Sequence, residues 1–253
     1  MRRARRRATA IALAVAALAA AGCGTSSSQP TLVVSAAASL QTAFTDYAHH
    51  FAAADLQQSF AASDQLAAQI RQGARPDVFA SADTALPDQL HRAGLVDRPR
   101  TFAGNRLVIA VPAGSDKVGS LADLERPGTS IVVGEPAVPV GAYTREVLGR
   151  LPASKRRAIV ANIRSQEPDT TSVLAKVTEG AADAAFVYAT DVKAVGGGVR
   201  AIRLPASLQP SVAYGVAVVK GSDHPVLAEQ VVAGLVHGAG QRALQRAGFL
   251  PPP

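Results

Sequence analysis

Short apolar runs that alternate with amphipathic helical patterns are the feature of this sequence that most restricts its fold. The predicted strands are Leu32–Ala36, Val78–Ala80, Arg106–Val111, Ile131–Gly134, Ala184–Tyr188 and Tyr214–Val219. The predicted helices are Ser39–Phe51, Ser63–Gln72, Ala142–Leu151, Thr170–Glu179 and Pro225–His237. Near-continuous apolar runs are typical of strands that helices cover on both faces. The alternation therefore predicts an α/β fold with mainly parallel sheets.

Small and hydroxyl-bearing residues stand where four of these helices begin. Ser39, Ser63 and Thr170 open three of them, and Val140-Gly141 leads into the fourth. The first turn of a helix has unpaired N–H groups and a partial positive charge, so it attracts anions. In open α/β sheets such helix starts gather at the carboxyl ends of the strands. Each serine or threonine alone is typical of an ordinary N-cap, but the four starts together suggest a shared anion site.

The N-terminus has the pattern of a secretory signal. Five arginines lie between residues 2 and 7, and an apolar run from Ala8 to Ala21, interrupted only by Thr9, follows them. This run is shorter than the roughly 20 residues that a membrane-spanning helix needs. Residues 1–22 are therefore predicted to be a signal peptide, and the protein is expected to be exported.

Cys23 is the only cysteine, which excludes an intramolecular disulfide and a site built from several thiolates. The segment Ala20-Ala21-Gly22-Cys23 resembles the bacterial lipobox, although the first position there is usually leucine. This resemblance implies that Cys23 is lipidated and that residues 23–30 form the lipidated cysteine and a flexible tether. The protein would then lie on the outer face of the cytoplasmic membrane, held only by its lipid.

Charge and motif content argue against two broad classes of function. The chain has 26 Lys and Arg against 19 Asp and Glu, but five of the arginines lie in the predicted signal. The remainder is nearly neutral, so nucleic-acid binding is not expected. The five histidines show no metal-ligand spacing, and no nucleophile elbow, phosphate loop or zinc-protease helix occurs. We therefore expect neither an enzyme nor a cofactor.

Four parts of the sequence together resemble the molybdate-binding proteins of ABC transporters. They are Val34–Leu40, Phe60–Ile70 with Gly73–Asp83, Val133–Pro136 with Val138–Tyr143, and Phe186–Asp191. The resemblance implies a type II periplasmic-binding-protein fold, with two lobes of mixed, mainly parallel sheets flanked by helices and the ligand in the cleft between them. Residues 31–105 plus 211–253 would form the first lobe, and residues 106–210 the second.

The resemblance also implies which residues hold the oxyanion. Ser39 and Ser63 would bind it from the first lobe. Val140 and Thr170, through backbone N–H groups, and Tyr188, through its phenol, would bind it from the second. Molybdenum would be held only as the oxyanion, through these five residues. Two of them depart from the family pattern, because Val140 replaces an alanine and Thr170 stands where valine is frequent.

The implied function is capture of molybdate, and also tungstate, for delivery by a monomeric binding protein to an ABC permease with its ATPase. Sulfate or phosphate stays open as an alternative ligand, because hydrogen-bond donors alone separate tetrahedral oxyanions poorly. A lipoprotein that has lost transport is a further alternative, which the intact ligand motifs disfavour.

Asp64 stands where the family commonly has serine or another small residue. A carboxylate facing molybdate would repel it, because molybdate offers only hydrogen-bond acceptors, whereas it could accept the proton of a singly protonated oxyanion such as phosphate. In the other interpretation, Asp64 points outward from the first helical turn, where the helix dipole favours a negative charge. We favour this second interpretation.

Overall fold

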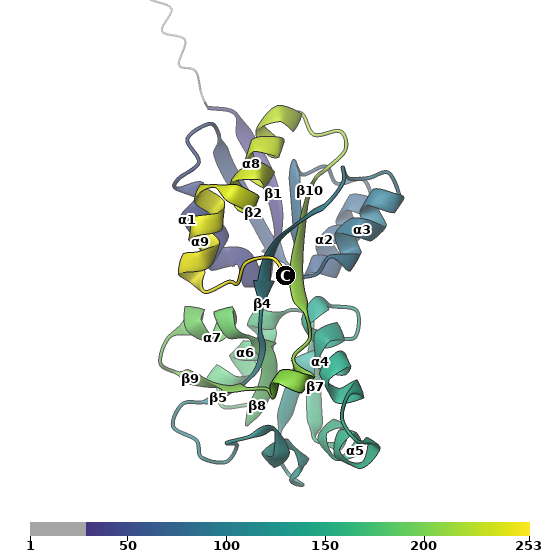
Figure 1. Cartoon of the computed structure of the whole chain (residues 1–253), viewed down its shortest axis with the longest axis vertical. Helices are drawn as coiled ribbons and strands as arrows, with labels where there is room; N and C mark the ends of the chain where they lie inside the picture. The colour runs from purple at the N-terminus through teal and green to yellow at the C-terminus, as the bar shows by residue number, and fades with distance from the viewer. Residues whose placement is uncertain (1–28) are drawn as a thin grey trace, which may run out of the picture.

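The computed structural model describes residues 29–253, which form two lobes lying one above the other in Figure 1. Each lobe holds a five-stranded sheet with helices packed against it. The predicted signal peptide, Cys23 and most of the predicted tether fall outside the described residues. Within residues 29–253, no helix is both long enough and apolar enough to cross a membrane.

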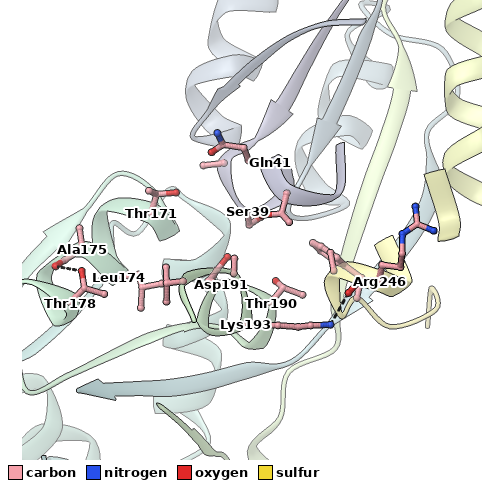
Figure 2. A pocket seen from close by; sticks show the side chains of 16 residues that line it. Ser39, Gln41, Thr171, Leu174, Ala175, Thr178, Thr190, Asp191, Lys193 and Arg246 are labelled. Atoms are coloured by element: carbon pink, nitrogen blue, oxygen red, sulfur yellow. Dashed lines mark hydrogen bonds between the residues drawn. The ribbon is translucent and has the colours of Figure 1, made fainter. Parts of the chain in front are cut away.

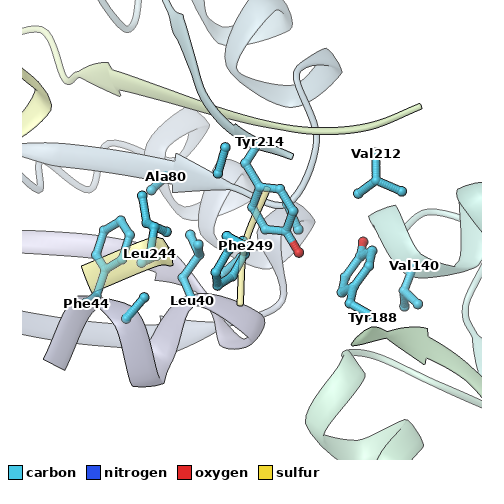
Figure 3. Packing of buried hydrophobic residues seen from close by; sticks show 14 of the residues in the cluster. Leu40, Phe44, Ala80, Val140, Tyr188, Val212, Tyr214, Leu244 and Phe249 are labelled. Carbon is cyan, nitrogen blue, oxygen red and sulfur yellow. The ribbon is translucent and has the colours of Figure 1, made fainter. Parts of the chain in front are cut away.

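Lobe 1 is built on the sheet with the strand order β2-β1-β3-β10-β4. Its strands are β1 (Thr31–Ala37), β2 (Asp55–Ala61), β3 (Val78–Ser81), β4 (Arg100–Asn105) and β10 (Val212–Val218). Its helices are the 3-10 turn η1 (Ala38–Leu40), α1 (Gln41–Ala48), α2 (Ser63–Arg71), α3 (Ala85–Arg92), α8 (Pro225–His237) and α9 (Ala239–Ala247). Leu40 and Phe44 pack with Leu244 and Phe249 in its core (Figure 3).

Lobe 2 is built on the sheet with the strand order β7-β6-β8-β5-β9. Its strands are β5 (Leu107–Pro112), β6 (Ile131–Gly134), β7 (Ile163–Glu167), β8 (Ala184–Tyr188) and β9 (Val199–Arg203). Its helices are η2 (Leu121–Glu125), α4 (Pro139–Gly149), α5 (Ala153–Ala161), α6 (Thr170–Thr178), α7 (Ala189–Val195) and η3 (Ala206–Leu208).

Both sheets are mixed, as predicted, but parallel pairs do not outnumber antiparallel ones. β1 pairs in parallel with β2 and β3, and β6 with β7 and β8. β10 runs antiparallel to β3 and β4, and β5 runs antiparallel to β8 and β9. The chain enters lobe 2 from lobe 1 through β5 and returns to lobe 1 through β10. These two strands therefore run antiparallel to their neighbours, which are connected by helices within each lobe.

Two chain segments cross between the lobes. The first passes directly from Asn105 at the end of β4 to Leu107 at the start of β5, and the second returns through η3 into β10. The two crossings lie side by side, because Val212 pairs with Asn105 in the antiparallel ladder (Figure 1). This pair of strands fixes how the carboxyl ends of the other strands meet between the lobes.

All six predicted strands and all five predicted helices are present, and Ile131–Gly134, Ala184–Tyr188 and Pro225–His237 have the predicted ends. Helix α4 begins at Pro139 and not at Ala142. Proline is favoured in the first helical turn because it has no N–H to leave unpaired and its φ is already helical. The prediction missed β2, β4, β7, β9, α3, α5, α7 and α9.

Candidate functional site

A small cavity lies where the carboxyl ends of strands from both lobes meet. Its lining residues are Ala37, Ala38, Ser39, Ala61, Ala62, Ser63, Ala82, Val138, Pro139, Val140, Pro168, Asp169, Thr170 and Tyr188. The cavity volume is about 20 Å³, the order of volume that one or two water molecules occupy. All five residues predicted to bind an oxyanion line it, two from lobe 1 and three from lobe 2. This size suits a small ligand in this arrangement of the lobes.

Four helices begin at this cavity, besides the short α7, whose N-cap residue Tyr188 also lines it. Their N-cap residues are Ala37 before η1 and α1, Ala62 before α2, Val138 before α4 and Asp169 before α6, and all four line the cavity. Each helix directs first-turn N–H groups and the positive end of its dipole toward the same small volume. No lysine, arginine or histidine is among the lining residues, so backbone and hydroxyl donors supply the positive potential.

The predicted serine and threonine starts are not N-caps. Ser63 and Thr170 are the first residues of α2 and α6, and Ser39 is the second residue of η1. The small apolar residues Ala37 and Ala62 cap η1 and α2 without a side-chain hydrogen bond. In α6, the Asp169 carboxylate accepts a hydrogen bond from the Ser172 N–H at 2.8 Å. The hydroxyl groups are therefore not used up in capping.

Ser63 is held so that its hydroxyl proton is available to a ligand. Its side chain is buried, and its Oγ lies 3.1 Å from the backbone N–H of Ala82. A backbone N–H can only donate, so the Ser63 Oγ accepts this bond. The remaining O–H of Ser63 can donate to a ligand in the cavity.

Tyr188 carries a buried polar group with no partner. The side chain is fully buried, and Figure 3 shows it between Tyr214 and Val140. Its Oη has no hydrogen-bond partner in the described part of the chain. Burial raises the pKa of Tyr188 well above its usual value of 10, so the phenol keeps its proton. A buried, unpaired O–H costs about 1–3 kcal/mol, which an acceptor in the cavity would recover.

Close backbone packing places Val140 in the first turn of α4. A Cβ added to Gly141 would lie 1.9 Å from the carbonyl oxygen of Glu135, in the loop that follows β6. A Cβ added to Gly134 would lie 2.5 Å from the side chain of Val140. Only glycine permits this approach, which seats the start of α4 directly on the end of β6.

Carboxylates lie near the cavity, but only that of Asp169 lines it, and this carboxylate caps its own helix. Asp64 lies in the first turn of α2 and does not line the cavity, but it is half-buried, so its outward orientation stays a prediction. One of its oxygens is buried without a hydrogen-bond partner among the described residues. Across residues 29–253, no group of three or more His, Cys, Asp or Glu side chains could hold a metal ion.

A larger groove of about 520 Å³ borders the cavity at Ala38 and Ser39. It runs between α1 and α9 of lobe 1 and α6 and α7 of lobe 2 (Figure 2). At one end the Lys193 ammonium donates a 2.7 Å hydrogen bond to the backbone carbonyl of Arg246. This bond crosses from lobe 2 to lobe 1, so the two lobes touch beside the cavity.

Two residues that the sequence did not single out support the site. Tyr214 Oη lies 3.2 Å from Ser39 Oγ, and Asn105 Nδ2 lies 3.3 Å from the same phenol oxygen. Tyr214 sits in a predicted strand, but the apolar pattern of that strand gives no sign that its hydroxyl reaches Ser39. Asn105 is the last residue of lobe 1 before the first crossing, and only the fold reveals that position.

Two α/β lobes joined by two crossing segments, with helix starts around a cavity between them, define a binding protein that encloses a small ligand. A family model described as bacterial extracellular solute-binding protein matches residues 32–250. The chain therefore belongs to the bacterial extracellular solute-binding protein family. The family is described as extracellular, which agrees with the predicted export of this chain.

Two relatives are similar to this chain over most of its length. The molybdate-binding protein ModA of Mycobacterium tuberculosis is 42% identical over 228 residues, covering 88% of this chain and 85% of the relative. YvgL of Bacillus subtilis, described as a putative ABC transporter substrate-binding lipoprotein, is 30% identical over 233 residues, covering 88% of each. These names describe solute capture and include neither an enzyme nor a cofactor, which confirms that this chain is a binding protein.

Solved structures support the fold. The periplasmic molybdate-binding protein of Azotobacter vinelandii superposes with a TM-score of 0.78 at 22% identity. The match covers 88% of this chain and 100% of that one. The predicted two-lobe periplasmic-binding-protein fold is thereby confirmed.

Proposed function

We propose that this protein captures molybdate outside the cytoplasmic membrane and delivers it to the permease and ATPase of an ABC importer. The 42% identity to ModA over most of the chain supports the ligand. The family supports the role of a solute-binding component. Tungstate, which is also a tetrahedral dianion, belongs to the same proposal.

The observation that carries the proposal is the direction of the hydrogen-bond donors around the cavity. Tyr188 offers a buried O–H with no partner, and Ser63 Oγ already accepts from a backbone N–H, so its own proton is free. Molybdate is fully deprotonated at neutral pH and offers only acceptors. A cavity that presents donors and four helix N-termini is complementary to such an ion.

The proposed ligand contacts follow from these positions. The hydroxyls of Ser39 and Ser63 would donate from lobe 1. The first-turn N–H groups of Val140 and Thr170, and the phenol of Tyr188, would donate from lobe 2. A ligand held from both sides binds the closed arrangement better than an open one, and this differential affinity is what drives the lobes together.

Membrane attachment and domain boundaries are part of the same proposal. Lipidation of Cys23 would tether the protein near its permease, and the description of YvgL as a lipoprotein supports this. The division into residues 31–105 plus 211–253 and residues 106–210 is supported by sheet membership, since β4 ends at Asn105 and β5 begins at Leu107. We further propose that the protein acts as a monomer.

Calorimetric titration of the chain from Gly24 onward with molybdate, tungstate, sulfate and phosphate tests the ligand. The proposal expects saturable binding of molybdate and tungstate, with sulfate and phosphate silent. Binding of phosphate or sulfate without a response to molybdate would replace the ligand. Silence for all four anions would favour a lipoprotein without a transport role.

A further inference from the structure

The amide of Asn105, at the crossing between the lobes, has a fixed orientation. Its Oδ1 accepts a hydrogen bond from the backbone N–H of Arg106 at 2.8 Å. Because a backbone N–H can only donate, the oxygen must face it, and the two protons of Nδ2 must face the other way. On that side lie Thr190 Oγ1 at 2.9 Å and Tyr214 Oη at 3.3 Å. Asn105 therefore donates to both hydroxyl groups.

This orientation sets the direction of the next bond. Tyr214 Oη has two hydrogen-bond partners in the described part of the chain, Asn105 Nδ2 and Ser39 Oγ. It accepts from Asn105, so its single proton goes to Ser39 Oγ at 3.2 Å. Burial raises the pKa of Tyr214 well above its usual value, which keeps that proton on the phenol. Ser39 Oγ is thus an acceptor, and its own O–H is directed away from Tyr214.

We propose that Asn105 and Tyr214 are positioning residues, which orient the Ser39 hydroxyl as a donor toward the oxyanion in the cavity. This inference rests on the proposed function. The hydrogen bonds form a series with one direction, from the Arg106 N–H through Asn105 and Tyr214 to Ser39 and the anion. Ser63 reaches the same state by accepting from Ala82, so the proton of each serine hydroxyl is free to donate to the ligand.

The series has a consequence for selectivity. An anion that keeps a proton at neutral pH, such as phosphate, needs at least one acceptor in its site. With Tyr214 in place, one lone pair of the Ser39 Oγ is occupied and its proton is directed away from Tyr214, so Ser39 meets the ligand as a donor. Without Tyr214, the Ser39 Oγ is free to accept. The series therefore favours fully deprotonated oxyanions over protonated ones at this position.

A double-mutant cycle with Tyr214→Phe and Ser39→Ala tests the inference, using calorimetric titration of the purified protein with molybdate. We expect Tyr214→Phe to weaken binding roughly tenfold, the effect of one hydrogen bond to a charged group. In the Ser39→Ala background the same change should have almost no further effect, because no hydroxyl is left to orient. An equal loss in both backgrounds would overturn the inference, because it would mean that Tyr214 only shapes the cavity.

Matched variants separate positioning from folding. Tyr47→Phe removes another buried phenol of lobe 1, whose Oη donates to the Val231 carbonyl, and it should lower the melting temperature without changing affinity. Asn105→Ala provides a second route if Tyr214→Phe does not fold, and its loss should also vanish in the Ser39→Ala background. If the parent protein binds molybdate and Tyr214→Phe and Asn105→Ala bind it equally well, the inference is refuted but the proposed function stands. If the parent protein binds no oxyanion, both the proposed function and the inference are refuted.

Discussion

Tyr188 carries a cost to stability that the proposed ligand would offset. Its phenol is fully buried with no partner, so the ligand-free protein carries the desolvation cost of that group. The proposed oxyanion supplies the missing acceptor. Strained or unsatisfied groups of this kind are typical of binding sites, where the fold is stable enough to hold them.

We expect Tyr188→Phe to make the ligand-free protein more stable by about 1 kcal/mol and to weaken molybdate binding by roughly ten- to a hundredfold. Thermal unfolding and calorimetry on the same samples measure both effects. Tyr47→Phe is the matched control, because the Tyr47 hydroxyl is already paired with the Val231 carbonyl within lobe 1. A Tyr188→Phe protein that is less stable but binds as tightly as the parent would contradict the role of this phenol.

Asp191 gives the site a distinct pH signature. It is buried at the start of α7, where its Oδ2 accepts from the Tyr188 N–H at 2.9 Å. Burial raises its pKa from 3.8 to about 7. Between these values the folded protein holds a proton that the unfolded chain has released. This group's contribution to stability therefore falls as pH rises from about 4 to about 7 and is constant above that.

We expect Asp191→Asn to remove this decline. The free energy of unfolding of the variant relative to the parent should rise on the order of 4 kcal/mol across that pH window. Urea unfolding at a series of pH values measures it. Parallel pH profiles for the two proteins would show that Asp191 ionises normally in the folded state.

At the residue scale, the five proposed ligand contacts could be placed at the cavity because their segments resemble a family motif in local sequence. Tyr214 and Asn105 could not, because their importance depends on contacts that join distant parts of the chain. Ser39 and Tyr214 are 175 positions apart, and Asn105 and Tyr214 are 109 apart. No local pattern records such a pair.

At the scale of secondary structure, every strand that the sequence analysis found is interior to its sheet, and every strand it missed is an edge. β2 and β4 border the sheet of lobe 1, and β7 and β9 border that of lobe 2. Interior strands are covered on both faces and read as apolar runs. The edge strands β2, β7 and β9 consist largely of exposed and half-buried residues, so their apolar signal in the sequence is weak.

The start of α4 provides a test at this scale. We expect Gly141→Ala to destabilise the protein by several kcal/mol and to weaken binding, because the new Cβ would collide with the Glu135 carbonyl and displace the Val140 N–H. Gly149→Ala, at the far end of the same helix, has nothing within 4 Å of the new Cβ and should be neutral or stabilising by up to about 1 kcal/mol. Chemical unfolding and titration of both variants would reveal the difference, and equal behaviour would refute the packing argument.

At the scale of the whole molecule, the two lobes meet through few direct polar contacts besides the crossing strands. The Lys193 ammonium binds the Arg246 carbonyl in the last turn of α9, where the helix dipole is negative. The Tyr143 hydroxyl contacts Ala213 on the returning strand. Contacts made only when the lobes are together contribute to ligand affinity by favouring the closed arrangement.

We expect Lys193→Met to weaken molybdate binding roughly threefold, mainly through faster release, because the bond is exposed and its strength modest. Stopped-flow dissociation measures this rate. Lys155→Met is the control, because Lys155 pairs with Glu125 within lobe 2 and should leave release unchanged. Equal release rates for Lys193→Met and the parent would show that this contact does not favour closure.

In the proposed complex, one tetrahedral oxyanion sits among the helix starts between the lobes. Anomalous diffraction at the molybdenum absorption edge, from crystals grown with molybdate, locates the metal without reference to any assumed contacts. We expect one strong peak in the cavity, with the bound oxygens within hydrogen-bonding range of Ser39, Ser63 and Tyr188. A peak elsewhere, or none in a protein that binds molybdate in solution, would contradict this placement.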